Sequence, residues 1–331
     1  MMGAVIKVAL VGLGMMGRHH ARVLRGVDGV ELVAAVDAQG DTHRALGQGV
    51  PLFTTVEQAI EHGIDAAVVA VPTIFHEEIG LTLAAAGVHC LIEKPVAHDV
   101  DAGRRLVEAF DAAGLVGAVG HIERYNPALQ SLRSRIAAGD LGEVYQIATR
   151  RQGPFPARIA DVGVVKDLAT HDIDLTAWLA QSGFETIFAQ SAHRSGRPNE
   201  DLVSVSGRLR NGIVTNHLVN WLSPLKERVT TVTGEKGTFV ADTITADLTF
   251  FANGTVSTSW DSIAAFRGVS EGEMVRYALT KREPLLVEHE AFRDAILGRA
   301  NDIVTLRDGL DTLRVAEAVV EASRTSTAIT I

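Results

Sequence analysis

The segment VIKVALVGLGMMG, residues 5–17, decides the fold of the first part of the chain. Its apolar first half is typical of a buried parallel strand. Gly12 allows a tight turn out of that strand, Gly14 lets the backbone approach a pyrophosphate, and Gly17 lets the next helix pack on the sheet. We expect this helix, about residues 15–25, to direct its N-terminal amides and positive dipole end at the phosphates.

An acidic residue follows the last of these glycines by twenty positions. Asp37 comes directly after a second apolar run, residues 30–36. A carboxylate there can accept both hydroxyls of an adenosine ribose but repels a 2′-phosphate, so the pattern predicts NAD, with NADP disfavoured. The alternative is an ordinary β-α-β unit whose small residues serve packing alone. The residues of this segment expected to bind the cofactor are Gly12, Gly14, Met15, Met16, Gly17 and Asp37.

Composition and charge narrow the classes of protein. The 331 residues are enough for two domains of roughly 100–200 residues each. A net charge of −9 argues against a nucleic-acid binder, which normally carries a basic surface. The single cysteine, Cys90, excludes an intrachain disulfide and fits a reducing cytoplasm. No run of about 18 apolar residues occurs, so no membrane span is expected.

Strand and helix patterns alternate up to residue 120 and then change. The alternation predicts a doubly wound parallel sheet, with ligands at the carboxyl ends of its strands. Later segments contain tight-turn signals, such as Asn211-Gly212, between short strands. We therefore expect residues 1–120 to form a Rossmann dinucleotide-binding domain. Residues 121–331 are expected to form an α/β domain with an open, largely antiparallel mixed sheet, for substrate binding and oligomerisation.

The tripeptide Glu93-Lys94-Pro95 follows a predicted strand, at the edge where ligands bind. A lysine there can donate hydrogen bonds to a substrate hydroxyl and stabilise a developing alkoxide. Proline fixes the exit of the chain, with either a trans or a cis bond. The alternative interpretation is a surface lysine beside a turn proline.

Asp167 and His171 are four residues apart in a predicted helix over residues 164–180. Such residues lie on one face about one turn apart. A carboxylate beside an imidazole raises its basicity and fixes its orientation, which suits general acid–base catalysis. The alternative is an ion pair on a helix surface. Together with a nicotinamide and Lys94, the pair would complete a set of hydride acceptor, hydroxyl-polarising cation and proton acceptor.

The segment HIERYNP, residues 121–127, links the two predicted domains and is expected to border the cleft between them. Further along, Arg150, Arg151 and Arg158 surround a Gly-Pro turn and could hold a diphosphate through bidentate contacts. The alternative is that these arginines form ordinary surface ion pairs. The residues predicted to contact the substrate are His121, Glu123, Arg124, Tyr125, Asn126, Arg151, Arg158 and Asp172.

A metal site is not expected from the histidines. His19 and His20 are adjacent on a predicted helix and cannot face one ion together. His76 lacks partners at ligand spacing, and the Gly-x-Ser-x-Gly motif of a nucleophile elbow is absent.

The combination of the glycine loop, Val71-Pro72-Thr73 with His76, Glu93-Lys94-Pro95 and the Asp167/His171 pair resembles the Gfo/Idh/MocA oxidoreductases over essentially the whole chain. The resemblance implies NAD(P)-dependent oxidation of a sugar or cyclitol hydroxyl by a homodimer or homotetramer. Lys94, Asp167 and His171 match the catalytic positions of that family, in which the group that takes the proton varies. We assign His171 as the base, Lys94 as the donor to the hydroxyl and Asp167 as the residue that orients His171. The further cofactor contacts that the resemblance implies come from Val71, Pro72, Thr73, His76, Glu93 and Lys94.

Within that family, residues 123–127, 153–158 and 161–174 are similar to the branch that includes UDP-N-acetylglucosamine 3-dehydrogenases. The substrate implied is a nucleotide sugar, with the arginines at the UDP diphosphate and the hydride leaving sugar C3. Two alternatives stay open: a dehydrogenase of inositol or of a free sugar, and an NAD-binding sensor without turnover. The sequence does not determine the sugar, the direction of reaction or the number of subunits.

Overall fold

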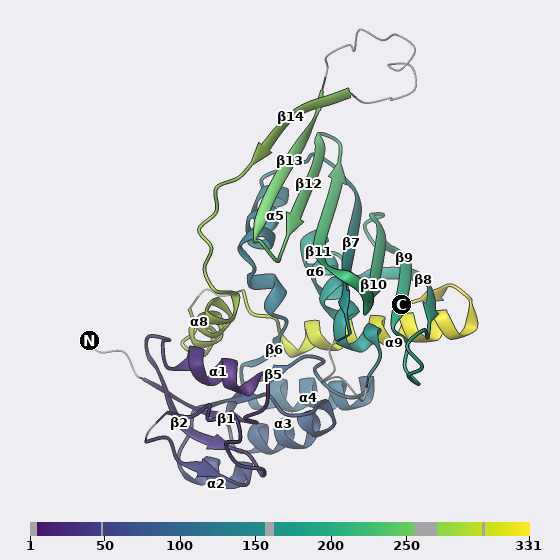
Figure 1. Cartoon of the computed structure of the whole chain (residues 1–331). Coiled ribbons are helices and arrows are strands. Elements are labelled where there is room, and N and C mark those ends of the chain that lie inside the picture. Colours follow the sequence, from purple (N-terminus) through teal and green to yellow (C-terminus); the bar gives the residue numbers. More distant parts are fainter. Residues whose placement is uncertain (1–4, 48, 156–161, 255–269, 300–301) are drawn as a thin grey trace. The chain divides into compact units, whose positions relative to one another are not determined.

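The structure is a computed structural model that describes residues 5–47, 49–155, 162–254, 270–299 and 302–331 (Figure 1). The chain divides into two compact units, and neither is continuous in sequence. The first comprises Met1–Ile122 and Glu283–Arg314, and the second comprises Glu123–Arg282 and Val315–Ile331.

The first unit is built on a six-stranded sheet in the order β3-β2-β1-β4-β5-β6. Every neighbouring pair is parallel, which confirms the predicted doubly wound sheet. Its two central strands, β1 and β4, are almost wholly buried, as expected when helices cover both faces. The strands are β1 (Ile6–Val11), β2 (Val30–Val36), β3 (Leu52–Phe53), β4 (Ala66–Val69), β5 (His89–Glu93) and β6 (Gly117–Gly120). The two-residue strand β3 was not predicted, because its apolar run is too short to show a period.

Helices follow the strands of the first unit, as predicted. The α4 helix is a clear case, because the Asp99 side chain accepts the Ala102 N–H at 2.8 Å and Gly114 ends the helix at a φ of 64°. The helical segments are α1 (Gly17–Leu24), α2 (Val56–Glu61), the 3-10 turn η1 (Thr73–Phe75), α3 (His76–Ala85), α4 (Val100–Ala113), α8 (Pro284–Ile296) and the first part of α9 (Leu306–Thr325).

The sequence predicted that residues 283–314 belong to a second domain of residues 121–331, and the structure differs from this prediction. Residues 283–314 pack with the first unit instead. Leu285 of α8 forms an apolar cluster with Val23 and Val27, and Thr305 bridges to Ala118 of β6. The sequence could not show this, because the contacts join segments nearly two hundred residues or more apart and leave no local periodicity.

The second unit is built on a nine-stranded mixed sheet in the order β14-β13-β12-β11-β7-β10-β9-β8-β15. Only the β7–β10 pair is parallel among the pairs of described strands, which confirms the largely antiparallel sheet. The predicted Asn211-Gly212 turn joins β9 to β10. The strands are β7 (Val144–Pro154), β8 (Phe184–Ala192), β9 (Leu202–Leu209), β10 (Val214–Asn220), β11 (Leu222–Gly234), β12 (Gly237–Asp242), β13 (Asp247–Gly254), β14 (Ser270–Arg276) and β15 (Ile329–Thr330).

One face of this sheet is covered by helices. Buried side chains of α5 (Pro127–Ala137), α6 (Thr170–Ala180) and the later part of α9 share a core with the strands. The strand β10 alternates, with Thr215, His217 and Val219 buried and Val214 and Leu218 exposed.

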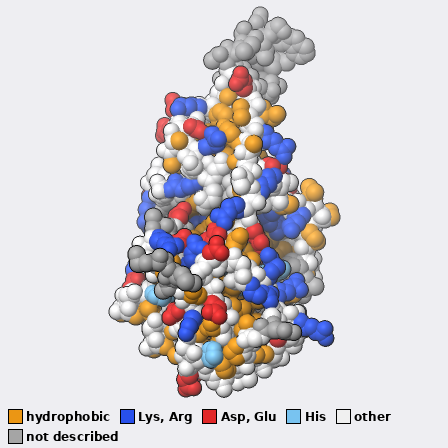
Figure 2. Space-filling view, turned by 90° about the vertical axis from the view of Figure 1, so that its left-hand side faces the viewer, with side chains coloured by type: hydrophobic (Ala, Val, Ile, Leu, Met, Phe, Trp, Pro, Cys, Tyr) orange, Lys and Arg blue, Asp and Glu red, His pale blue; other side chains and the backbone are white. Residues whose placement is uncertain are grey.

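The opposite face of the sheet carries exposed apolar side chains. Figure 2 shows orange side chains among blue and red ones at its upper end, over β13 and β14. The large apolar residues exposed on this face of the two strands are Phe251 and Met274, which pair with each other. This face is therefore less polar than an ordinary solvated sheet surface.

The crossing of the glycine loop and α1 gives a first testable prediction. A Cβ atom on Gly17 would lie 2.0 Å from the Gly12 carbonyl oxygen, which is backbone and cannot move aside freely. We expect Gly17→Ala to destabilise the fold by at least the roughly 1–3 kcal/mol typical of overpacking. Gly14→Ala is the matched control, since its Cβ would meet no atom of the described chain within 4 Å. Equal thermal unfolding midpoints for the two variants would contradict this account.

Candidate active site

The glycine loop turns the chain from the end of β1 into α1. Gly12 has a φ of 95°, a conformation that favours glycine, and its N–H donates to the Val36 carbonyl at 2.8 Å. Gly14, in contrast, has open space where a Cβ would stand in the described chain. The protein's own packing therefore gives no reason for glycine at this position, whereas the close approach of a ligand does.

Asp37 ties the end of β2 to the glycine loop. One carboxylate oxygen accepts the Leu13 N–H and the other accepts the Gln39 N–H, each at 2.8 Å. The side chain is half-buried. A carboxylate offers about four lone-pair sites, so two bonds to the backbone leave acceptors for ribose hydroxyls. The loop, the space at Gly14 and this carboxylate fit the adenosine and pyrophosphate of NAD.

Lys94 follows β5 at the same edge of the sheet as the glycine loop and Asp37, since parallel strands end together. Its N–H donates to the Glu93 carboxylate at 3.1 Å, and the Lys94–Pro95 peptide bond is cis. The predicted strand-end placement of Lys94 is thus what the first unit shows. Contact of Lys94 with a cofactor or substrate stays a prediction.

His76 lies at the start of α3, fully buried. Its Nδ1 is 2.9 Å from the Pro95 carbonyl and its Nε2 is 3.0 Å from the Val71 carbonyl. Burial lowers the pKa of His76, against the effect of these two carbonyls. The His76 ring therefore links the segment after β4 to the segment after β5. Both of its nitrogens lie at backbone carbonyls, and its contact with the cofactor stays a prediction.

A buried polar cluster stands behind Glu93. His20 of α1 lies between Glu93 and His289 of α8, with 2.9 Å from ring nitrogen to partner on each side. Glu288 is also buried, and neither of its carboxyl oxygens has a hydrogen-bond partner among the described residues. Burial, and then the charge of Glu93, raise the pKa of Glu288 well above its ordinary value. Sequence reasoning missed this cluster, since His20 was considered only as a metal ligand.

Asp167 and His171 lie in the second unit, in one helical segment that is not uniform. Asp167 belongs to a π-helical turn, Val165–Ala169, and His171 to the α6 helix that continues it. The sequence predicted an uninterrupted helix here, but the wider turn still places residues four apart about one turn apart. Single π turns occur often at functional sites. Asp167 is buried and His171 is half-buried.

Two of the predicted arginines of the second unit, Arg124 and Arg151, are buried and bound to carboxylates, whereas Arg150 is exposed and pairs with Glu227. Arg124 donates two hydrogen bonds to Asp174, at 2.8 and 2.5 Å. Arg151 donates to Asp172 at 2.9 Å and to Glu123 at 2.7 Å. Burial alone would lower the pKa of Arg151, but the two carboxylates raise it above its usual range. The positive charge of Arg151, which was expected to meet a diphosphate, is therefore balanced by two carboxylates of the protein.

The remaining predicted substrate residues divide into three groups. Asn126 caps α5, accepting the Ala128 N–H at 3.0 Å and donating to the Thr243 carbonyl at 3.0 Å. His121 and Tyr125 are buried, His121 in the first unit and Tyr125 in the second. Arg158 lies outside the described residues.

Arg228 of β11 was not predicted. It is half-buried, and its guanidinium donates to the carbonyls of Gln152 and Glu227 at 2.9 and 2.8 Å. Burial, and then the charge of Arg151, lower its pKa, while nearby carboxylates that include Asp167 act in the other direction. Its position beside charged residues of α6 and β7 comes from strand pairing, which the charged run Lys226-Glu227-Arg228 does not reveal.

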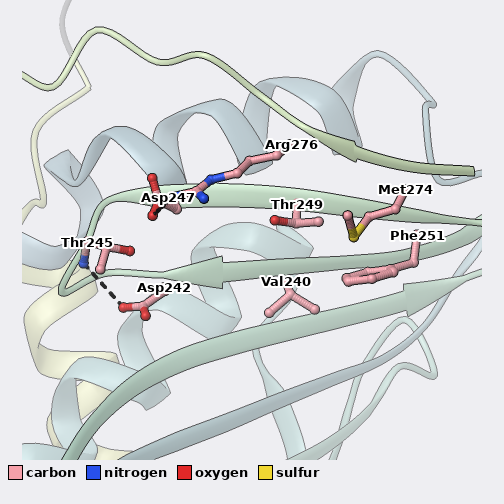
Figure 3. Close-up of a pocket in the computed structure, with 8 residues that line it drawn as sticks. All are labelled: Val240, Asp242, Thr245, Asp247, Thr249, Phe251, Met274 and Arg276. Atoms are coloured by element: carbon pink, nitrogen blue, oxygen red, sulfur yellow. Dashed lines mark hydrogen bonds and ion pairs between the residues drawn. The ribbon is translucent and has the colours of Figure 1, made fainter.

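A hollow on the outer face of β12, β13 and β14 contains none of the predicted site residues (Figure 3). Val240, Phe251 and Met274 form its apolar part, and Asp247 and Arg276 lie at the other end. In the described part of the chain, no three His, Cys, Asp or Glu residues are grouped so that they could hold a metal ion. No described helix is both long enough and apolar enough to cross a bilayer.

Two family models match the chain. The model for the oxidoreductase family with an NAD-binding Rossmann fold matches residues 6–121, and the Gfo/Idh/MocA C-terminal domain matches residues 129–240. The chain belongs to the Gfo/Idh/MocA family. The first unit is thus the NAD-binding Rossmann part of a member of this oxidoreductase family, as the glycine loop predicted.

Similar members of the Gfo/Idh/MocA family differ in the substrates that their names give. UDP-N-acetylglucosamine 3-dehydrogenase from Acidithiobacillus ferrooxidans is 31% identical over 64% of this chain and 66% of that protein. Inositol 2-dehydrogenase 2 from Saccharopolyspora erythraea is 30% identical over 59% of this chain and 60% of its own. A solved structure of the Acidithiobacillus enzyme superposes with a TM-score of 0.84, covering 97% of this chain and 98% of that one at 26% identity. The matched sequence thus spans slightly under two thirds of each of these two curated relatives.

The ion pairs of Arg151 give a second prediction. Arg151→Met leaves two buried carboxylates without their cation, so we expect it to cost about 3–5 kcal/mol of unfolding free energy. Arg150→Met, on the neighbouring exposed position of β7, is the control and should cost less than about 1 kcal/mol. Chemical denaturation measures both. If Arg151→Met kept wild-type stability, Arg151 would not be the structural cation described above.

Glu288 gives a third prediction, on pH. Its pKa is raised in the folded protein, so its proton is held more tightly there than in the unfolded chain. The stability of the wild type should therefore fall as the pH rises from about 4, the ordinary range of a glutamate, towards the raised folded value. At about pH 8 we expect Glu288→Gln to unfold at a higher temperature than the wild type. In acid, where Glu288 is protonated, this difference in unfolding temperature should disappear. An unchanged difference across the pH range, or the same behaviour in Glu290→Gln on the same helix, would refute this assignment.

Proposed function

We propose that this protein is an NAD-dependent dehydrogenase that oxidises a ring hydroxyl of a sugar. The observation that carries the proposal is the placement of Lys94 at the end of β5, on the sheet edge that also carries the glycine loop and Asp37. A lysine there is suited to act on a substrate hydroxyl beside a bound dinucleotide. Membership of the Gfo/Idh/MocA oxidoreductases supports the same reaction class.

We assign the acid–base roles as follows. Lys94 donates a hydrogen bond to the reacting hydroxyl and stabilises its developing negative charge. His171 takes the hydroxyl proton, and Asp167 orients the His171 ring. Bound NAD supplies the hydride acceptor. The π turn that carries Asp167 supports a functional role for this segment.

For the substrate we propose a UDP-N-acetylhexosamine, oxidised at C3. The support comes from the relative named UDP-N-acetylglucosamine 3-dehydrogenase, at 31% identity. The buried ion pairs of Arg124 and Arg151 count against diphosphate binding by these two side chains, because neither is an unbalanced cation. Arg158 keeps its predicted role as a phosphate-binding residue.

Those same ion pairs favour a second candidate, a dehydrogenase of inositol or of a free sugar. Such a substrate has no diphosphate and needs no unbalanced arginine. The relative named inositol 2-dehydrogenase 2, at 30% identity, supports this alternative.

The proposal also covers cofactor choice, assembly and location. Asp37 favours NAD, because a 2′-phosphate would meet a carboxylate that is already fixed by two backbone amides. We propose that the exposed apolar face of the nine-stranded sheet pairs with a second copy in a homodimer or homotetramer. We also propose a cytoplasmic location, and substrate binding by the second unit.

The test of function is NADH formation, followed by absorbance, with UDP-N-acetylglucosamine, free N-acetylglucosamine and myo-inositol. We expect turnover with the nucleotide sugar and a fall of about 10²–10⁴-fold in Lys94→Met and in His171→Gln. Lys7→Met is the matched control, an exposed lysine on β1 of the same sheet.

Each other outcome of this test has a definite meaning. Turnover of myo-inositol or the free sugar alone would select the second candidate. If the protein bound NAD but formed no NADH with any of the sugars tested, the non-catalytic sensor would be selected. Wild-type turnover in His171→Gln would show that another group takes the proton.

A further inference from the structure

A continuous chain of hydrogen bonds runs from α8 to the end of β5. His289 Nε2 lies 2.9 Å from His20 Nδ1, and His20 Nε2 lies 2.9 Å from Glu93 Oε1. The two rings meet edge to face, at 90° and 5.1 Å between centroids. The two histidines are almost fully buried, and the Glu93 side chain is 12% exposed. A chain of this kind is held in one geometry, because bulk water does not compete for its bonds.

The acceptor at one end fixes the direction of the whole chain. A carboxylate only accepts, so His20 Nε2 must carry the hydrogen that it donates to Glu93. In a neutral His20 ring the other nitrogen, Nδ1, is then the acceptor for the Nε2–H of His289. Burial lowers the pKa of His289 well below its ordinary value, so that ring is neutral. With His20 neutral, the tautomers of both rings therefore follow from the single acceptor at Glu93.

Glu93 passes this constraint to Lys94. Its second oxygen accepts the Lys94 N–H at 3.1 Å. Across the sheet, Glu93 pairs with Gly120 of β6, where an added Cβ would lie 3.2 Å from the Glu93 carboxyl group. The carboxylate therefore fills the space left by a missing side chain, and it is held by His20 on one oxygen and the Lys94 backbone on the other.

We propose that His20 and His289 are positioning residues that act through Glu93 to hold Lys94 in place at the end of β5. The proposal rests on the proposed function, in which Lys94 acts on the substrate hydroxyl. Neither histidine needs to touch substrate or cofactor for this role. The competing explanation is that the two rings only fill space in the core.

Three variants separate these explanations. His20→Leu removes the donor to Glu93 at similar volume, whereas His20→Gln keeps an N–H near the position of Nε2. His89→Leu is the matched control, since His89 lies at the other end of β5 and accepts the Val116 N–H. We expect kcat to fall roughly tenfold to a hundredfold in His20→Leu, as for a small misplacement of a catalytic group. The KM should change little, His20→Gln should recover most of the kcat, and His89→Leu should keep the wild-type kcat.

A second measurement does not depend on turnover. The chain has six lysines, so lysine-selective ¹⁵N labelling resolves the Lys94 backbone amide. We expect this amide to exchange with solvent faster in His20→Leu and in His289→Leu than in the wild type, and at the wild-type rate in His89→Leu. This result would stand even if no sugar reduced NAD, so the positioning role and the proposed function can fail separately.

The proposal is overturned if Lys94 exchange is unchanged in both leucine variants. It is also overturned if kcat falls equally in His20→Gln and His20→Leu. Equal losses would mean that the hydrogen bond to Glu93, which only His20→Gln keeps, does not matter for kcat. Should His20→Leu not fold, His289→Leu and His20→Gln still decide between the two explanations.

Discussion

The close contact between Gly17 and the Gly12 carbonyl is the constraint from which the first unit develops. Because no Cβ separates them, α1 can lie directly against the end of β1. This placement brings His20, one turn into α1, to the end of β5 and within 2.9 Å of Glu93. The glycine that lets α1 pack on the sheet thus also sets the position of His20, through which we propose that Lys94 is held.

The second unit depends on a different kind of constraint, charge burial. Arg124 and Arg151 are each buried and balanced by carboxylates from the 3-10 turn η2 (Ile122–Tyr125) and from α6. Removing either partner from such a pair leaves an uncompensated charge, so the cluster fixes how α6 sits on β7. The π turn that carries Asp167 begins the same helical segment, so its position depends on this ionic packing as well as on the apolar core.

Much of the fold could be predicted because its signals are local. The glycine loop, the apolar run before Asp37 and the Asn211-Gly212 turn are each predicted by a pattern of only a few consecutive residues. The placement of Lys94 followed from the rule that parallel strands end at one edge. What could not be predicted depends on pairing across long distances in sequence. His20 meets His289 over 269 positions, and Arg124 meets Asp174 over 50. The spacing of apolar residues carries no information about such contacts, so the carboxylate partners of Arg124 and Arg151 could not be predicted.

The division of α9 has a consequence for how the protein is made. Its residues up to Arg314 complete the first unit, and those from Val315 belong to the second. The nucleotide-binding sheet is translated by residue 120, yet α8, with His289, and the first part of α9 emerge from the ribosome only after most of the other unit. The first unit therefore begins synthesis before the second but lacks its last segments until most of the second unit has been made. Because its two segments are not contiguous, truncating the gene at one position cannot yield the complete first unit.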